Sequence, residues 1–224
     1  MQIEKHRAQG IKIPKDEVLR YLGYGKNTAD GISGVLIDEC IGAVYAALDC
    51  RACYAEFDIA RAGENLLDLG FAEVKSEALS KNLDGCEKIV LFTATIGMQT
   101  DRLIQKYSQV SPSKAVVFQA AGAAAIEEYC DLLNREIAEK YALRGLYPRP
   151  RFSPGYGDFP ISCQKNIFDV LDCTRKIGVT LTDGMLMMPS KSVSAIIGFS
   201  KERTLCAKSG CDGCGKTDCA FRRI

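Results

Sequence analysis

The segment RFSPGYGDFP, which begins at Arg151, gathers side chains that could hold a small polar ligand. Arg151 can form a fork of hydrogen bonds with a carboxylate, and Tyr156 presents a flat apolar ring with a hydroxyl at its tip. Pro154 stiffens the chain, and Gly155 lets a ligand lie against the backbone. Ser153 adds a hydroxyl and backbone partners. These groups suit an amino-acid-like ligand that carries a nucleoside, although a structural Pro-Gly turn explains the same residues without a ligand.

A second group of chemically capable residues lies in the C-terminal segment CAKSGCDGCGKTDC. Its cysteines follow the spacing C-x4-C-x2-C-x4-C, and they are Cys206, Cys211, Cys214 and Cys219. Four thiolates suit tetrahedral zinc or an iron–sulfur cluster, and the glycines between them let the chain wrap a small centre. A tail with free thiols or a disulfide is the plain alternative. We expect a metal centre here, and the spacing does not choose between zinc and iron–sulfur.

Composition excludes several classes of function. The chain has 224 residues with a formal net charge of +1, so no global field attracts nucleic acid or an anionic membrane. No run of residues approaches the length of a membrane span, and the N-terminal residues lack the apolar block of a signal peptide. Eleven cysteines at irregular spacing do not resemble a secreted disulfide scaffold, which predicts a cytoplasmic protein. His6 is the only histidine, and we expect it to be a solvated residue of the N-terminal tail rather than a catalytic group.

Hydrophobic periodicity predicts a mixture of helices and strands. Helical spacing begins at Pro14, at Thr28 for about five turns, at Met98 and at Ser111, and NIFDVLDCTRKIG is a further helix that ends at Gly178. Strands are predicted in ACYAEFDIA, ENLLDLG, KIVLFTATIG, MLMMPS and SVSAIIGFS. KIVLFTATIG is apolar throughout, which indicates a central strand buried on both faces. We therefore expect one mixed α/β domain over residues 1–204 and a cysteine-rich tail over residues 205–224.

Two short stretches allow both a functional and a structural interpretation. QAAGAAA, within the helix that starts at Ser111, has small side chains that admit a ligand or a packed neighbour, and tight packing against a sheet is favoured. CRAC, from Cys50 to Cys53, resembles a redox pair, but its position between a helix and a strand favours a core role.

Several ordered motifs resemble one known family. RFSPGYGDFP, the helix after it and LTDGMLMMPSKSVSAIIGFS match, in this order, the Arg-x-x-Pro-Gly-Tyr motif, helix and Met-x-Pro-x-x-Ser-Val-Ser segment of the activation domain of cobalamin-dependent methionine synthase. The helix AIEEYCDLLNREIAEKY is also similar to the family's. LGYG, LDGCEKIVLFTATIG and MMPSKSVSAIIG resemble the stand-alone bacterial members, and the resemblance spans roughly residues 14–203.

The resemblance implies an α+β fold with a central twisted, mostly antiparallel sheet flanked by helices. It also implies a site for S-adenosylmethionine. By position, the binding residues implied are Arg151, Ser153, Gly155 and Tyr156. In the family the arginine recognises the ligand, and the tyrosine lies near the cobalamin. Glu127 matches an acidic residue beside the site, although a solvated helix carboxylate would look the same.

The implied function is reactivation of a separate cobalamin-dependent methionine synthase, as a component of that methyltransferase activity. The family converts inert Co(II) cobalamin back to methylcobalamin, with an electron from flavodoxin or ferredoxin and a methyl group from S-adenosylmethionine. No protein base is needed for that transfer, so no catalytic residue is expected. The chain lacks the Asp-x-His-x-x-Gly motif of a cobalamin domain, so the partner must supply the cobalamin. The alternative is an iron–sulfur or zinc-bearing activator or adaptor of another corrinoid methyltransferase.

The sequence departs from the family pattern at three places. No residue clearly corresponds to the N-terminal aspartate that the fused enzyme uses on the ligand. Gly157, Asp158 and Phe159 replace Pro-Ala-Cys after the tyrosine, and Ser190 and Lys191 replace smaller residues. The sequence alone therefore does not determine the shape of the pocket rim.

The tail prediction is tested by purifying the protein without oxygen. An iron–sulfur cluster would give a brown preparation with broad blue-end absorbance, and Cys211→Ser would abolish it because one thiolate ligand is lost. Zinc in place of a cluster would leave the preparation colourless but detectable by metal analysis. A preparation with neither iron nor zinc would contradict the predicted metal centre.

Overall fold

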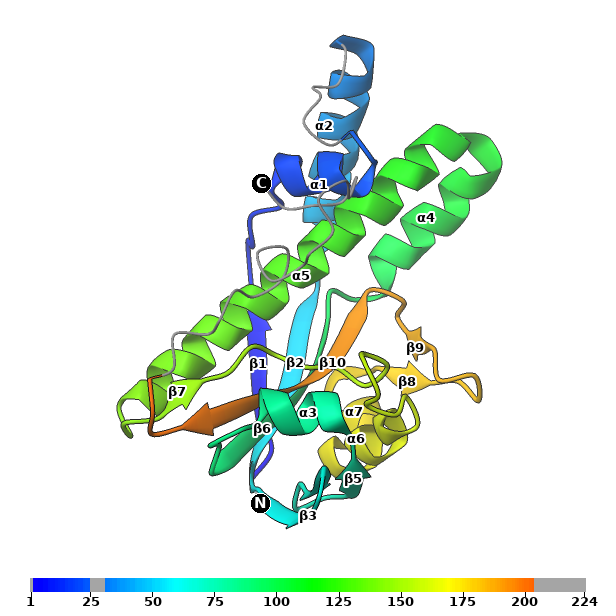
Figure 1. Ribbon diagram of the computed structural model, residues 1–224. Coiled ribbons are helices and arrows are strands. Elements are labelled where there is room, and N and C mark those ends of the chain that lie inside the picture. The colour runs from blue at the N-terminus through cyan, green and yellow to red at the C-terminus, as the bar shows by residue number, and fades with distance from the viewer. Residues whose placement is uncertain (1, 25–30, 204–224) are drawn as a thin grey trace.

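A five-stranded sheet forms the centre of the molecule, and every strand pair in it is antiparallel (Figure 1). The computed structural model describes residues 2–24 and 31–203. In spatial order the strands are β1 (Glu4–Ala8), β2 (Cys50–Asp58), β6 (Lys88–Thr95), β10 (Ser192–Ser200) and β7 (Tyr147–Pro148). Two smaller sheets consist of β3 (Ala60–Gly63), β4 (Leu66–Asp68) and β5 (Glu73–Lys75), and of β8 (Thr180–Leu181) and β9 (Met187–Met188). The predicted α+β class with a central antiparallel sheet is confirmed.

Helices cover both faces of this sheet. They are α1 (Lys15–Tyr21), α2 (Gly31–Ala47), α3 (Glu77–Asn82), α4 (Met98–Val110), α5 (Pro112–Ala142), α6 (Cys163–Leu171) and α7 (Cys173–Ile177). The long helix α5 crosses one face, with α1, α2 and α4 packed against it, whereas α3, α6 and α7 lie on the opposite face (Figure 1). As the sequence predicts, α5 begins after Ser111 with Pro112 at its first position.

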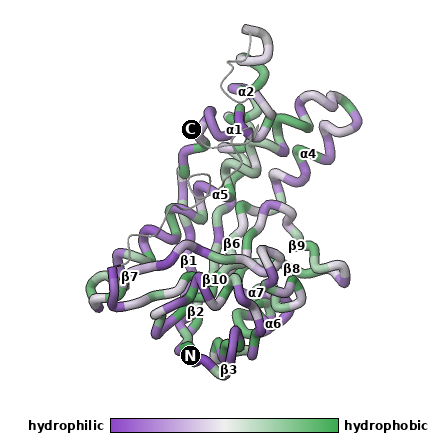
Figure 2. The backbone as a smooth tube through the Cα atoms, in the orientation of Figure 1, coloured by the Kyte–Doolittle hydropathy of each residue, from purple (hydrophilic) through white to green (hydrophobic). Residues whose placement is uncertain are grey.

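The sheet separates two hydrophobic cores, and β2 shows how one strand serves both. Cys50 and Ala52 pack in the core on the α5 side, while Cys53 and Ala55 pack in the core on the α6 side. Successive strand side chains point to opposite faces, so Cys50 and Cys53 do not face each other. The two cysteines of CRAC are thus core residues, and burial raises the pKa of the Cys50 thiol to about 12. In Figure 2, hydrophobic residues concentrate where the strands pass between the helices.

The small side chains of QAAGAAA are explained by close neighbours within the protein. A Cβ added at Gly122 would lie 2.9 Å from Cγ2 of Thr100 and 3.1 Å from Cε of Lys191. Thr100 belongs to α4, and the Lys191 side chain lies along α5, where its ammonium donates to Gln119 Oε1 at 2.7 Å. At Gly122 the close neighbours belong to the protein, as the packing interpretation predicted, but they are α4 and Lys191 rather than a strand of the sheet.

His6 is not a solvated tail residue, so that expectation is wrong. It lies in β1, whose five residues pair with β2, and its side chain is 18% exposed. Its Nδ1 lies 3.0 Å from the hydroxyl of Tyr129 and its Nε2 lies 2.8 Å from Glu136 Oε2, both on α5. The N-terminal residues are mostly polar because alternate residues of this edge strand face solvent, so the strand was not recognised from the sequence.

The single helix predicted over NIFDVLDCTRKIG is divided in two. Asp172 adopts a left-handed conformation with φ of 51° and separates α6 from α7. Gly178, also left-handed, ends α7 as predicted. The short elements β5 and α3 were not predicted, since three to six residues carry too little periodicity to be recognised.

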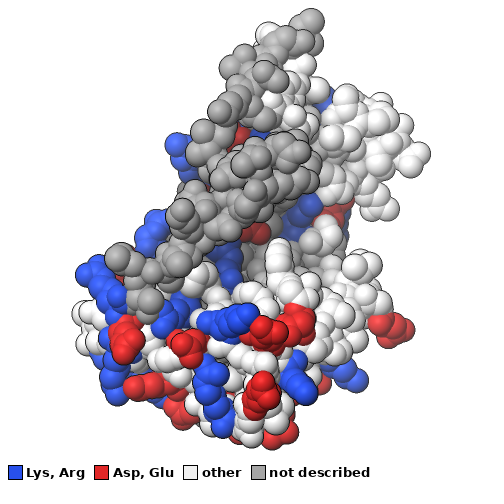
Figure 3. Space-filling model, viewed as in Figure 1, with Lys and Arg blue, Asp and Glu red and all other residues white. Residues whose placement is uncertain are grey.

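Charges on the visible face alternate in sign rather than forming one field. Figure 3 shows Lys and Arg side chains interspersed with Asp and Glu over the lower part of the molecule. Within residues 2–24 and 31–203, no helix is both long and apolar enough to cross a membrane.

Glu56 joins three elements and should make stability depend on acid. Its carboxylate accepts hydrogen bonds from Arg144 and from Tyr141 at 2.6 Å, and it pairs with Lys88 at 2.8 Å. The hydrogen bond from Arg144, followed by those from Lys88 and Tyr141, lowers the pKa of Glu56 from 4.5 to about 2. The unfolded chain therefore binds the proton more readily, and the contribution of Glu56 is lost as pH falls from about 4.5 towards 2.

We expect Glu56→Gln to reduce the pH dependence of unfolding in this acidic window, because the substituted side chain cannot titrate. Urea unfolding measured from about pH 5 to about pH 2.5, which covers most of the window in which Glu56 titrates, tests this pH dependence. Glu139→Gln is the matched control, since Glu139 is an exposed α5 residue with no ion pair among those found in the described part of the chain. Equal acid sensitivity of Glu56→Gln and wild type would refute the assignment.

Candidate functional site

A cavity of about 340 Å³ lies where the first residues of β10 meet α5, α6 and the 151–156 loop. This volume is within the range of small-molecule sites. Its lining combines charged, polar and apolar side chains. They are Glu127, Arg151, Phe152, Ser153, Pro154, Tyr156, Gln164, Met187, Ser192, Val193 and Ser194.

The structure brings together four of the five predicted binding residues. Arg151, Ser153 and Tyr156 reach this cavity from the loop, and Glu127 reaches it from α5. Gly155 is not among the lining residues. Its backbone N–H donates to the carbonyl of Phe159 at 2.8 Å, and its φ of 93° turns the chain. Contact between a ligand and the Gly155 backbone remains a prediction.

Backbone pairing with β10 sets the position of the loop. The N–H of Arg149 donates to the carbonyl of Gly198 at 2.7 Å, and Phe152 and Ile196 exchange both backbone hydrogen bonds at 2.9 Å. Residues 149–152 thus extend the sheet beyond β7, and the chain leaves the sheet at Ser153. Since β10 gains no strand partner on that side at 192–194 within the described residues, the cavity occupies a free sheet edge.

Arg151 is held by two carboxylates of α5. One guanidinium nitrogen donates to Glu127 Oε2 at 2.5 Å, and the other donates to Asp131 Oδ1. Burial lowers the pKa of Arg151, but the hydrogen bond to Asp131 and the charge of Glu127 outweigh it, so the guanidinium stays charged. Asp131 was missed by the sequence analysis, although its position four residues after Glu127 places both carboxylates on one helix face.

Asp158 anchors the far side of the loop to the start of α3. Its carboxylate accepts from the hydroxyl of Ser76 at 2.5 Å and from the backbone N–H groups of Glu77 and Ala78 at 2.7 and 3.0 Å. These bonds, that from Ser76 first, lower the pKa of Asp158. The departure from the family's Pro-Ala-Cys is therefore a specific tie between the loop and a neighbouring helix.

Gly157 permits this tie because the loop and α3 approach closely. A Cβ at Gly157 would lie 2.8 Å from the Cβ of Ala78, and its φ of 55° is left-handed. Phe159, which follows Asp158, is 1% exposed and packs in the core on the α6 side. All three residues that differ from the family motif thus have a structural purpose.

Ser190 and Lys191 also make contacts within the chain. The N–H and hydroxyl of Ser190 each donate to Asp101 on α4 at 2.6 Å. Lys191 lies against α5, where burial lowers its pKa. Neither residue lines the cavity, so these larger side chains do not narrow it.

One wall of the cavity is polar. Ser192 Oγ donates to the carbonyl of Pro189 at 2.7 Å, and the Met188–Pro189 peptide bond is cis. Gln164 is 5% exposed and Ser194 is 2% exposed, and neither Gln164 Oε1 nor Ser194 Oγ has a hydrogen-bond partner among the described residues. The serines of the SVSAIIG motif and Gln164 were not among the predicted site residues.

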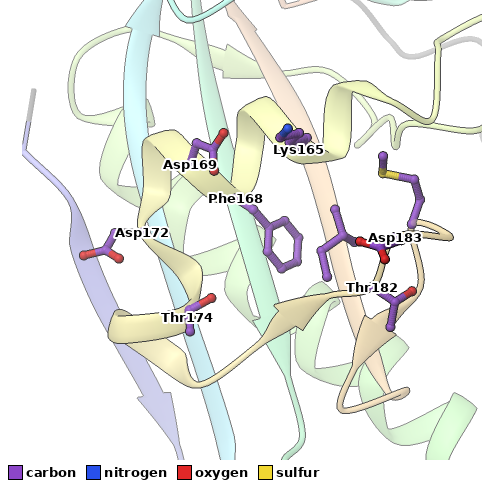
Figure 4. Close-up of a pocket in the computed structure, with 9 residues that line it drawn as sticks. Lys165, Phe168, Asp169, Asp172, Thr174, Thr182 and Asp183 are labelled. Atoms are coloured by element: carbon purple, nitrogen blue, oxygen red, sulfur yellow. The ribbon is translucent and has the colours of Figure 1, made fainter.

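A larger cavity, of about 530 Å³, lies on the other side of α6 (Figure 4). Its acidic groups do not converge. Asp183 lies beside Thr182 on one side of Phe168, whereas Asp172 projects to the opposite side. Asp172 also pairs with Arg175 at 3.3 Å. This cavity contains none of the predicted binding residues, so we place the candidate site in the smaller one.

The four tail cysteines lie outside the described residues, and a metal centre there remains a prediction. Within the part of the chain that the structure describes, no group of three or more His, Cys, Asp or Glu side chains is arranged to hold a metal ion. Its seven cysteines are all free thiols.

The fold and this cavity define a class: an α+β domain with a cavity of small-molecule size at the free edge of an antiparallel sheet. Residues 79–206, more than half of the chain, match the family described as "Vitamin B12 dependent methionine synthase, activation domain". The protein belongs to this family, as the sequence motifs predicted.

Solved structures show the same fold. The crystal structure of the MetH reactivation domain bound to AdoHcy is similar with a TM-score of 0.59 and 16% sequence identity. The similarity covers 88% of this chain and 78% of that chain. No match was found among curated proteins.

The contact between the loop and α3 predicts unequal costs for two glycine substitutions. Gly157→Ala should destabilise more than Gly145→Ala, because both residues have positive φ but only Gly157 has a neighbour within 4 Å of an added Cβ. The shared backbone cost is about 1–2 kcal/mol, and the clash with Ala78 adds to it. Urea unfolding measures both variants, and equal destabilisation would show that the loop does not depend on this approach.

Proposed function

We propose that this protein binds S-adenosylmethionine in the cavity beside Arg151 and supports reductive methylation of Co(II) cobalamin on a separate methionine synthase. The observation that carries the proposal is that one cavity gathers Arg151, Ser153 and Tyr156, which the family motif assigned to the ligand, with Glu127, which matched an acidic residue beside the family's site. Membership of the activation-domain family supports the same function. A protein of the same fold has been crystallised with AdoHcy, the product left when the methyl group departs.

The charged end of the cavity suits an amino acid zwitterion. Arg151 offers N–H donors to a carboxylate, and Glu127 offers an acceptor to an ammonium. The two residues pair with each other at 2.5 Å, so neither charge is left without a partner. The acid that recognises the ammonium would then come from α5, which accounts for the missing N-terminal aspartate.

The other end of the cavity is open to a partner. Tyr156 lines the cavity and is 67% exposed. Exposed apolar side chains lie nearby: Leu186 and Met188, which flank the cavity residue Met187 along the chain, are 69% and 49% exposed. Ile161, whose Cδ1 lies 3.2 Å from a Cβ added at Gly155, is 45% exposed. Apolar surface next to a ligand site favours a docking face for another protein. The methyl group of the ligand would be presented here.

The transfer itself asks for orientation rather than acid–base chemistry. Reduced cobalt is the nucleophile, its electron pair forms the bond to the methyl carbon, and the sulfonium leaves as a neutral thioether. The residues of this chain hold the donor, align it and limit water. The only histidine is engaged by Tyr129 and Glu136, away from the cavity, which fits a site without a general base.

The partner supplies the cobalamin, and flavodoxin or ferredoxin supplies the electron that produces Co(I). The cytoplasm, where these partners occur, is the proposed compartment. The alternative of an iron–sulfur or zinc-bearing activator of another corrinoid protein depends on the tail cysteines and is decided by the anaerobic preparation described above.

Arg151→Ala should weaken S-adenosylmethionine binding about 30-fold, since a hydrogen bond to a charged group contributes about 2 kcal/mol. Titration calorimetry measures the dissociation constants of wild type and variant. Arg144→Ala is the matched control, because Arg144 also binds a carboxylate, that of Glu56, but does not line the cavity. Circular dichroism verifies that each variant is folded.

Absence of binding to the wild type, or equal affinity in Arg151→Ala, would contradict the proposal. A second arm follows labelled methyl from S-adenosylmethionine to a cobalamin-binding methionine synthase under reducing conditions. An adaptor that kept the fold but lost the ligand would bind that partner without transferring label.

A further inference from the structure

Two buried polar groups without partners lie on one wall of the cavity. Gln164, near the start of α6, and Ser194, in β10, are both more than nine-tenths buried. Gln164 Oε1 and Ser194 Oγ have no hydrogen-bond partner among the described residues. Seven buried side-chain atoms of the described residues are in this state, and these two alone belong to residues that line the cavity.

Buried polar atoms without a hydrogen-bond partner are unusual in folded proteins. Folded proteins pair the large majority of their buried polar atoms, because an unpaired one costs free energy that water would otherwise recover. A donor and an acceptor left unpaired on the wall of a ligand cavity are therefore poised to pair with the ligand. Ser192, the nearest hydroxyl along β10, differs in that its proton is already donated to Pro189.

The chemistry of the two side chains specifies the group that they can recognise. A glutamine amide carries an acceptor and a donor side by side, and a serine hydroxyl can act as either. An adenine ring presents the complement, an amino donor next to a ring-nitrogen acceptor, and a glutamine amide pairs with it at two points. The two points are the 6-amino group and N7 of adenine, and on that edge an inosine-type base presents two acceptors, its 6-carbonyl and N7, so it cannot donate to Gln164 Oε1 there.

The surroundings of this wall suit a flat base. Phe152, Pro154, Met187 and Val193 supply apolar surface within the same cavity. Ile196 exchanges its backbone bonds with Phe152, on the side away from β6. By the alternation of an antiparallel strand, the backbone of Ser194 faces the same free edge. The polar wall is thus distinct from the charged end formed by Arg151 and Glu127.

We propose that Gln164 and Ser194 read the amino edge of the adenine ring and thereby set the base specificity of the site. This inference rests on the proposed function, in which the ligand is S-adenosylmethionine. Arg151 and Glu127 hold the amino acid end, and the polar wall selects the base.

The experiment compares S-adenosylhomocysteine with its deaminated counterpart S-inosylhomocysteine by titration calorimetry on the full chain. The wild type should prefer the adenosyl compound by about tenfold or more, in line with the discrimination of a two-point amide contact. Gln164→Met keeps a similar side-chain volume but loses both hydrogen-bonding atoms. It should bind the adenosyl compound about tenfold more weakly and show no preference between the two.

Ser194→Ala provides a second, smaller change in case Gln164→Met fails to fold, and it should reduce the preference in the same direction. Ser80→Ala is the matched control. Ser80 Oγ is also buried without a partner, but Ser80 lies in α3 and does not line the cavity. Its substitution should leave both affinities and the preference unchanged.

The outcomes separate this inference from the proposed function. Equal binding of both compounds by the wild type, or an unchanged preference in Gln164→Met and Ser194→Ala, overturns the role of the polar wall while ligand binding stands. Binding of neither compound to the wild type overturns the proposed function and the inference together. A preference that Ser80→Ala also removes would show that it arises from general packing, and this too overturns the inference.

Discussion

The pairing of Arg151 with Glu127 and Asp131 is the interaction on which the candidate site depends. It joins α5, which covers one face of the sheet, to the loop that leaves the sheet beyond β10. A guanidinium that is only 20% exposed must keep its charge paired, and two acceptors on one helix face fix its position. The cavity exists because this pair spans the gap between helix and loop while the residues after Arg151 turn away. Removal of either side would leave an unpaired charge at the cavity wall.

Two further sets of contacts fix the position of the loop. Asp158 binds the first turn of α3, and Phe152 pairs with Ile196 in β10. The loop is therefore attached to a helix on one side of the sheet edge and to a strand on the other. A site whose walls are fixed before binding loses less conformational entropy when the ligand arrives. Gly157 contributes by allowing close approach to Ala78, not by allowing movement.

The sequence predicted the parts of this structure that depend on local pattern. The long apolar run of β6 and the periodicity of α4 and α5 are strong signals, and both matched. The Arg-x-x-Pro-Gly-Tyr motif correctly indicated which loop borders the cavity. His6 was misjudged because its partners are more than a hundred residues away, and Asp131 was missed because only the fold places it beside Arg151. Gln164 was overlooked for the same reason: nothing near it in sequence reveals that α6 begins at the wall of a cavity built by β10.

The division of labour within the cavity follows from where each element lies. Helix α5 and Arg151 supply charge, α6 and β10 supply neutral hydrogen-bonding groups, and the loop supplies an exposed aromatic ring at the mouth. Arg151 and Glu127 are already paired, so the charged end could exchange these partners for the two charges of an amino acid zwitterion and leave neither residue without a counter-charge. Neutral groups without partners provide selectivity, because a base that cannot pair with them leaves their desolvation uncompensated. A methyl donor held at both ends would place its sulfonium between them, towards Tyr156. A separate metal centre could approach there without disturbing the residues at the two ends.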